Sequence, residues 1–327
     1  CGGKKALKLL SFGHCWVILC VLVTLPWNRE RVMALPIGFR LYRPKKRCAP
    51  DQYRKRTALA RELVEKVSEL IPEKRRVLLI GDTEYAGREV VRGLTDRIVF
   101  VGPMHMGAAL YDMPQRNNKG FGRPRKKGTR LLSPIQLIES NKTPWKSRRL
   151  TLYGKKVQVL TKTQNCLWYR VAGNRLVRMI VTRDPKGRIE DRAYFVTDAK
   201  MGVREIAQSF SMRWSQEEMH RNIKQYLGLE DPQNGWWRRP KGQRRNKRIP
   251  GPKPHKTRGA KAVAHTIPFI LTIYALVVLW YLVNGSAKDD VERARARAPW
   301  YRDKVEPSFA DMLAALRRCL WAEQSFS

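Results

Sequence analysis

Acidic residues are scarce in this sequence. Its 327 residues include 28 Asp and Glu against 66 Lys and Arg, which gives a formal net charge of +38. A folded protein with this excess repels itself, so its natural partner is expected to be a polyanion. We therefore predict nucleic acid as the first partner, with an anionic membrane surface as the alternative.

Cysteine is sparse as well. The six cysteines are scattered, form no C-x-x-C pair and have no histidine nearby at zinc-ligand spacing. Scattered thiols of this kind are typical of buried side chains in a reducing cytosol. The pattern favours a cytoplasmic location and gives no indication of a disulfide framework.

Long apolar stretches are limited to two. Residues 15–26 make up about half of the ~20 residues that a membrane span needs, and their β-branched content predicts a buried strand. Residues 265–283 are long enough to span, but Pro268 and Thr272 interrupt them. We interpret this second run as the core helix of a large domain, with a membrane span as the alternative, and we expect no membrane partner.

The first hundred residues alternate between strand and helix patterns. Apolar runs at 14–25 and 32–42, joined by a short link, predict an antiparallel hairpin. A helix is expected from Asp51, as its N-cap, to Leu70. A strand, a helix and a second strand follow at residues 77–80, 88–94 and 98–101. This order predicts an α/β fold with a mixed sheet and helices.

The composition and periodicity of the sequence change after the first hundred residues. Residues 115–130 are polar and basic and predict an exposed loop. Short alternating runs over 147–196 predict an inserted antiparallel β-lobe, and helical periodicity returns at 203–227. Residues 238–261 hold eleven Lys or Arg and no acid, which predicts a mobile basic loop. A last amphipathic helix is expected near 309–321.

Asp82 is the first candidate for chemistry. It follows Gly81 at the carboxyl end of the predicted strand 77–80, where α/β sheets place their sites. Gly81 would let the backbone approach a metal ion closely. A metal ligand and an N-cap for the next segment are equally good interpretations of this aspartate.

The predicted helix 203–227 carries the second candidate. At 100° per residue, Phe210, Arg213, Glu217 and Lys224 fall on one face. In an isolated helix, a solvated ion-pair stripe would be the preferred interpretation of these residues.

The wider pattern changes that balance. Phe210-x2-Arg213-x3-Glu217-x6-Lys224 resembles the Tyr-Arg-Glu-Lys signature of bacterial insertion-sequence transposases of the DDE class. The string R-W-S-Q-E-E-M-H-R-N-I-K-Q-Y-L-G-L-E-D is similar to that family well beyond the four spaced residues, and G-D-T-E-Y resembles its second-aspartate strand. The resemblance covers most of the chain.

The resemblance implies a fold and an activity. The fold is an RNase H-like mixed sheet, interrupted by an inserted antiparallel β-lobe. The core would occupy 1–103 and 197–327, with the insertion at 104–196 and a basic loop at 236–262. The activity is metal-dependent strand cleavage and strand transfer at the ends of an insertion sequence, in the bacterial cytoplasm near the nucleoid.

The resemblance also assigns roles to residues. Asp82 and Glu217 are the expected catalytic and metal-binding carboxylates, holding two Mg²⁺ ions, with Mn²⁺ as a substitute. Double-stranded DNA is the expected partner, and the active complex is expected to be a homodimer. The residues expected to contact DNA or its phosphates are Phe210, Arg213, Trp214, Lys224, Arg123, Arg125, Lys126, Arg238 and Arg239. Around Arg123, the string G-R-P matches the core of minor-groove hooks, although a nonspecific phosphate-binding loop is the preferred interpretation.

Two features depart from the family pattern. Phe210 replaces the tyrosine of the signature, and the only aspartate ahead of Asp82 is Asp51, which does not lie on a predicted strand. We therefore expect the chain to be N-terminally truncated and inactive by itself. The alternative is a catalytically dead, DNA-binding remnant. Asp198 is a possible third ligand, but a helix cap or turn is the preferred interpretation of it.

Overall fold

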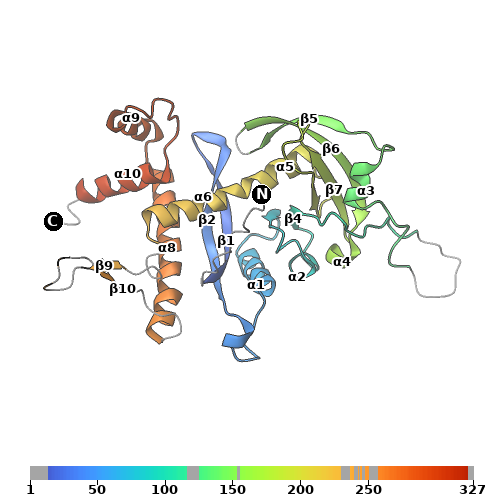
Figure 1. Cartoon of the computed structure of the whole chain (residues 1–327), viewed down its shortest axis with the longest axis horizontal. Coiled ribbons are helices and arrows are strands. Elements are labelled where there is room, and N and C mark those ends of the chain that lie inside the picture. The colour runs from blue at the N-terminus through green and yellow to red at the C-terminus, as the bar shows by residue number, and fades with distance from the viewer. Residues whose placement is uncertain are drawn as a thin grey trace, which may run out of the picture.

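The computed structural model describes residues 14–115, 125–152, 155–229, 236–238, 242, 244, 247–249 and 257–322. Over these residues the protein is a mixed α/β structure (Figure 1). A curled six-stranded sheet lies on one side, and a long two-stranded hairpin crosses the middle. A group of helices from the C-terminal third covers the hairpin on the other side.

The six-stranded sheet has the order β3-β4-β8-β7-β6-β5, with β3 parallel to β4 and every other pair antiparallel. Its strands are β3 Val77–Ile80, β4 Ile98–Pro103, β5 Lys146–Leu152, β6 Lys155–Leu167, β7 Leu176–Arg183 and β8 Arg192–Val196. The antiparallel strands predicted within 147–196 are therefore present. They continue the sheet of β3 and β4, because β8 pairs with β4 and Phe195 packs on Phe100 with ring centroids 5.5 Å apart.

The N-terminal hairpin was correctly predicted. β1 Cys15–Leu25 pairs antiparallel with β2 Asn28–Tyr42 around a tight turn at Pro26 and Trp27. The link is shorter than the sequence suggested, because β2 begins at Asn28. Trp27 packs edge-on against Tyr281, and this contact ties the turn to the C-terminal helices.

The first helices are shorter than predicted. α1 spans Arg56–Glu69 and its N-cap is Lys55, so the expectation that Asp51 caps this helix was wrong. Asp51 instead lies in a turn that precedes it. Leu59 and Leu63 of α1 pack on Val17 of β1. A single 3-10 turn, η1 Lys45–Arg47, and three short helices, α2 Arg88–Val91, α3 Pro134–Glu139 and α4 Tyr169–Ala172, complete this half.

The predicted helix 203–227 is broken in the middle. α5 Val203–Met212 ends and α6 Trp214–Tyr226 begins on either side of Arg213. The Ser211 and Ser215 hydroxyls each donate to a carbonyl three residues back, at 2.7 Å. Such side-chain bonds compete with the backbone ladder and tighten or bend a helix locally. The Arg213 amide accordingly bonds at the shorter three-residue spacing, to the Phe210 carbonyl.

The C-terminal third is helical: α8 Thr257–Asn284, α9 Ala287–Arg297 and α10 Phe309–Ala322. The helix near 309–321 is thus confirmed. Within the predicted basic loop, β9 Trp236–Arg238 pairs with β10 Lys247–Ile249, and α8 already begins at Thr257. α8 packs beside the hairpin, α6 and α10 in the second hydrophobic core. Of the described helices, α8 alone is long and apolar enough to cross a membrane.

Candidate functional site

Asp82 lies at the carboxyl end of β3 and its side chain is exposed. Its Oδ1 accepts the backbone N–H of Glu84 at 2.9 Å and that of Tyr85 at 3.4 Å. Asp82 therefore stabilises the turn that follows the strand. It is not the N-cap of the next helix, as one interpretation had it, because α2 begins at Arg88 with Gly87 as its N-cap. Its second carboxylate oxygen, Oδ2, takes no part in these two bonds.

Gly81 is required by packing. A Cβ atom at this position would lie 2.8 Å from Cζ of Phe100 and 3.3 Å from Cβ of Tyr85. The Phe100 ring is fully buried and held against Phe195, so it has little room to withdraw. This close approach explains the glycine without any appeal to a metal ion.

Three residues of the predicted stripe, Phe210, Arg213 and Glu217, remain in contact across the break at Arg213. The Arg213 guanidinium donates to Glu217 Oε1 at 2.8 Å and lies 5.9 Å from the centre of the Phe210 ring. Phe210 in turn packs on Tyr194 of β8, with ring centroids 4.6 Å apart. Glu217 stays substantially exposed, at 44% of its side chain, so the ion pair by itself adds little stability.

One cavity brings Asp82 and α6 together. It has a volume of about 220 Å³, and Asp82 lines it from β3 while Arg213, Gln216 and His220 line it from α6. The walls are completed by β1, α1 and the aromatic rings of Tyr85 and Phe100. Glu217 follows Gln216 on the helix but does not itself line this cavity. Asp82 and Arg213 therefore line the same cavity, and Glu217 is connected to it only through its ion pair with Arg213.

His220 is the residue that sequence reasoning missed. Burial and the charge of Lys224 hold its pKa below the ordinary value of 6.5, although Glu217 opposes them. The lowered pKa favours the neutral imidazole at pH 7, whose one unprotonated ring nitrogen can accept a proton or a ligand. The available signal was its spacing: His220 lies seven residues after Arg213, two turns along the same helical face.

Two unpaired strand edges meet at the same cavity. β1 pairs with β2 on one side only, and β3 pairs with β4 on one side only; no other strand in the described part of the chain bonds to either. Because Val77 and Gly81 donate toward β4, the N–H groups of Leu78 and Ile80 point to the open edge. β3 was predicted to be a buried strand, but as an edge strand it leaves Leu78 41% exposed.

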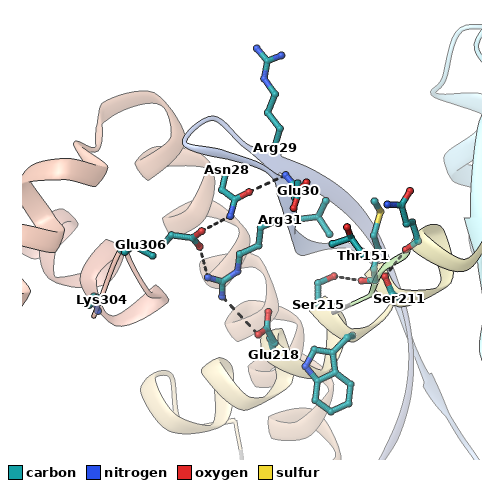
Figure 2. Close-up of a pocket in the computed structure, with 15 residues that line it drawn as sticks. Asn28, Arg29, Glu30, Arg31, Thr151, Ser211, Ser215, Glu218, Lys304 and Glu306 are labelled. Carbon is teal, nitrogen blue, oxygen red and sulfur yellow. Dashed lines mark hydrogen bonds and ion pairs between the residues drawn. The ribbon is translucent and has the colours of Figure 1, made fainter. Parts of the chain in front are cut away.

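A second and larger cavity lies near the other face of α6 (Figure 2). Its volume is about 760 Å³, and Trp214, Ser215 and Glu218 line it from α6. The hairpin turn and the segment 304–306 close it on the opposite side. Figure 2 shows Arg29 pointing away from the other labelled side chains. Trp214, a predicted DNA contact, is therefore separated from Asp82 by the helix.

The charges in this larger cavity are largely matched. Arg31 bonds to Glu306 at 2.6 Å and approaches Glu218 at 3.8 Å, and Asn28 donates to the other oxygen of Glu306 (Figure 2). Burial alone would raise the pKa of Glu306, but the bonds from Asn28 and Arg31 outweigh it and lower that pKa. These contacts fasten the segment 304–306 to the hairpin turn.

The basic side chains predicted to meet DNA are spread over separate elements. Arg125 and Lys126 are exposed in the loop predicted at 115–130. Close to them in sequence, the backbone of Asp112 bonds to the backbone of Thr129 and of Gly128. Lys224 is exposed on α6, and Arg238 lies on β9 opposite Lys247. Arg123 and Arg239 lie outside the described residues.

Asp198 has structural partners. It forms an ion pair with Arg76, and its Oδ1 accepts the backbone N–H of Lys200 at 2.9 Å. Burial would raise the Asp198 pKa, but these bonds outweigh it and lower the pKa below its ordinary value. The turn interpretation therefore fits this residue. In the described ranges, no three His, Cys, Asp or Glu side chains gather closely enough to hold a metal ion.

Comparison with known proteins adds no assignment. No protein-family model matches the chain, and no curated protein matches it at a significant level.

Proposed function

We propose that this chain is the core of a DDE-type DNA transposase, which cleaves and transfers DNA strands at the ends of an insertion sequence in the bacterial cytoplasm. One observation carries the proposal. A single cavity joins Asp82, at the end of a strand, to Arg213 and His220 of a helix that lies far away in the sequence. One residue of each pattern that resembles the family, Asp82 of G-D-T-E-Y and Arg213 of the Phe-Arg-Glu-Lys signature, thus lines the same cavity.

Two features of the mixed α/β fold support the proposal of an RNase H-like core. The chain runs strand, strand, helix, strand, helix, strand, with β3 parallel to β4 and Asp82 at the carboxyl end of β3. The open edges of β1 and β3 border the same cavity, which is where a further strand would join the two sheets. In this proposal that strand supplies the third carboxylate.

The side chains present suit magnesium. Mg²⁺ prefers one or two carboxylates together with water and phosphate oxygens. Asp82 offers Oδ2, and Glu217 offers Oε2 because Arg213 holds its other oxygen. When bound, a pair of such ions activates a water or 3′-hydroxyl and stabilises the leaving oxygen of an in-line displacement.

The remaining residues of this chain bind and orient DNA. Arg213 keeps Glu217 aimed along the helix and, with its other N–H groups, can reach a phosphate in the cavity. Neutral His220 can accept a proton beside it. The excess of Lys and Arg holds double-stranded DNA, and the active complex is a homodimer with no membrane role.

A DNA-binding protein without catalysis is the second candidate. The observation in its favour is that both carboxylates already have structural partners, Asp82 in its turn and Glu217 with Arg213. Such a protein would keep the fold and the basic surface but lack a complete metal site.

Two measurements test the proposal. Duplex DNA binding by the 327-residue chain should weaken steeply with salt, since each neutralised phosphate contributes about −0.9 to the slope of log K against log salt. Strand cleavage with Mg²⁺ or Mn²⁺ is then measured for this chain and for the complete product of its gene.

The expected outcome is salt-dependent binding by both proteins and cleavage by the complete gene product only. Binding by both without any cleavage supports the second candidate. Cleavage by the 327-residue chain alone would show that its carboxylates suffice, with Asp198 the first residue to examine. Affinity that barely changes with salt would contradict both candidates.

A further inference from the structure

Three exposed aromatic side chains line one cavity that the proposed function does not use. Trp300, Tyr301 and Tyr226 are exposed over 78%, 57% and 44% of their surfaces. The cavity has a volume of about 820 Å³ and lies where the end of α6, the end of α9 and the start of α10 come together, far from the six-stranded sheet (Figure 1). Several large aromatic side chains gathered at a protein surface mark a binding site, whereas a single exposed one needs no explanation.

The loop between α9 and α10 holds two of these rings in place. The Tyr301 amide donates to the Ala298 carbonyl at 2.8 Å, and the Lys304 amide donates to the Tyr301 carbonyl at 3.1 Å, so the loop is folded into two successive turns. The Arg295 guanidinium donates to the Lys304 carbonyl at 2.9 Å and ties these turns back to α9. Rings held in this way lose little conformational freedom when a ligand stacks on them.

The residues around these rings are mainly basic. The stretch 293–302 reads R-A-R-A-R-A-P-W-Y-R, and all four of its arginines are exposed. Two exposed carboxylates, Glu292 and Asp303, flank this stretch. A third, Asp311, also lines the cavity, but it is buried and paired with Lys304 at 2.5 Å. Four exposed arginines against two exposed carboxylates favour an anionic ligand, and the aromatic rings favour one that also has planar faces.

We propose that this cavity, which we call the aromatic site, binds single-stranded DNA. Unpaired bases stack on the rings of Trp300 and Tyr301. Arg297, which lines the cavity, and Arg302, which follows Tyr301 in the chain, bind the phosphates that link those bases. Aromatic rings among basic side chains are how proteins hold single strands without reading their sequence. The choice of DNA over RNA rests on the proposed function, because the same side chains suit both.

α6 connects the aromatic site with the cavity of Asp82. Arg213, at the start of this helix, lines the Asp82 cavity, and Tyr226, at its end, lines the aromatic site. The helix has 13 residues, so the two sites are separated by about 20 Å at 1.5 Å per residue. Arg221 and Lys224 are exposed on α6 between them. A DNA strand that runs from one site to the other would therefore pass basic side chains on the way.

The test is binding of the 327-residue chain to a labelled oligothymidylate about ten nucleotides long, a length within the range of single-strand sites, measured by fluorescence anisotropy. Trp300→Ala should weaken this binding about five- to a hundredfold, as expected for the loss of one stacked base. Trp321→Ala is the matched control, because Trp321 is also exposed, at 69%, but lies at the other end of α10 and does not line the cavity. It should leave the affinity unchanged. Circular dichroism should show that both variants are folded.

Two further measurements examine the contacts. Arg302→Gln should make the slope of log K against log salt less steep by about 0.7, the contribution of one single-strand phosphate. Arg47→Gln, which changes an exposed arginine of η1, should leave the slope unchanged. Photocrosslinking with an oligonucleotide that carries 5-iododeoxyuridine, followed by mass spectrometry, should attach the strand to Trp300 or Tyr301.

The outcomes are distinct. Oligothymidylate affinities that are equal for Trp300→Ala, Trp321→Ala and the wild-type protein would overturn the proposal. Equal weakening of single-strand and duplex binding by Trp300→Ala would also overturn it, because the bases of a duplex are not free to stack on the ring. Tighter binding of an oligouridylate of the same length would assign the site to RNA.

A membrane surface is the remaining alternative. Binding to phosphatidylserine vesicles that Trp300→Ala abolishes, with oligothymidylate binding intact, would assign the site to lipid and overturn the proposal. None of these measurements needs strand cleavage. A failed cleavage assay would therefore count against the proposed function, whereas an unchanged Trp300→Ala variant would count against the aromatic site alone.

Discussion

Arg213 and Glu217 are joined across one turn of α6 by a 2.8 Å bond between Nη2 and Oε1, at the point where the helix breaks away from α5. The pair orients a carboxylate whose neighbours on the same helix line a cavity shared with Asp82. An ion pair this exposed contributes under about 1 kcal/mol to stability. In the proposed transposase, the ion pair would matter because it orients the Glu217 carboxylate.

Glu217→Gln should separate metal binding from DNA binding. In a cleavage-competent form of the protein, the substitution keeps the shape but removes the charge that would hold an ion, so the rate should fall by orders of magnitude. DNA affinity should stay constant or rise slightly. Glu218→Gln is the matched control, because Glu218 faces the other cavity and its ion pairs with Arg31 and Arg221 are long, at 3.8 and 3.9 Å. Equal rates for the two variants would show that the stripe is a solvated ion-pair face.

Gly81→Ala should destabilise the fold by about 1 to 3 kcal/mol, because the added methyl group meets the buried Phe100 ring at 2.8 Å. Urea unfolding measures the change. Gly202→Ala is the control: nothing lies within 4 Å of its added Cβ, and its backbone is extended. The control should cost less than about 1 kcal/mol, as for a helix N-cap. If both substitutions were tolerated alike, the close approach of Gly81 and Phe100 would be refuted.

Lys162→Met should be among the more costly substitutions in the sheet. Lys162 is buried in β6, and its ammonium donates to three carbonyls at the end of α3, those of Leu137, Ile138 and Ser140, at 2.8, 3.2 and 2.7 Å. Methionine fills the space but leaves those acceptors unbonded, at an expected cost of about 2 to 4 kcal/mol. Thermal or urea unfolding checks this value. Lys156→Met, on the exposed part of the same strand, should change stability by less than about 0.5 kcal/mol.

Lowering the pH should remove the stabilisation that ionised Asp311 gives to the N-terminal end of α10. Burial opposes ionisation of Asp311, but bonds from Lys304 at 2.5 Å and from the Ser308 hydroxyl at 2.6 Å outweigh it and lower the Asp311 pKa below 3.8. Because the folded-state pKa is the lower one, this stabilisation is complete above about pH 3.8 and is lost as the pH falls through the folded value.

Asp311→Asn should therefore remove part of the pH dependence. Unfolding midpoints measured between pH 6 and pH 3 should fall less for Asp311→Asn than for the wild-type protein, while at pH 6 the variant should be the less stable of the two. Asp303→Asn, which alters an exposed carboxylate in the preceding loop, serves as the control. A variant with the full wild-type pH dependence would contradict the assignment.

Local pattern was enough to predict many elements. The hairpin, β3, β4, the strands within 147–196 and α10 follow from alternation and helical periodicity, because each is specified by side chains within a few residues. The same reasoning placed the start of α1 at Asp51, since Asp is a good N-cap. The structure starts it at Arg56, where Leu59 and Leu63 can reach β1.

The sequence by itself determined the basic charge, the strand that ends at Asp82 and the spacing of Arg213, Glu217 and Lys224, because these are properties of neighbouring residues. Tertiary structure decided what they face. Packing sets Arg213 and His220 in a cavity with Asp82, while Trp214 lines another. It also decided which face of α8 is buried: both faces are apolar in sequence, and only the packing of the hairpin, α6 and α10 against one of them leaves the other exposed.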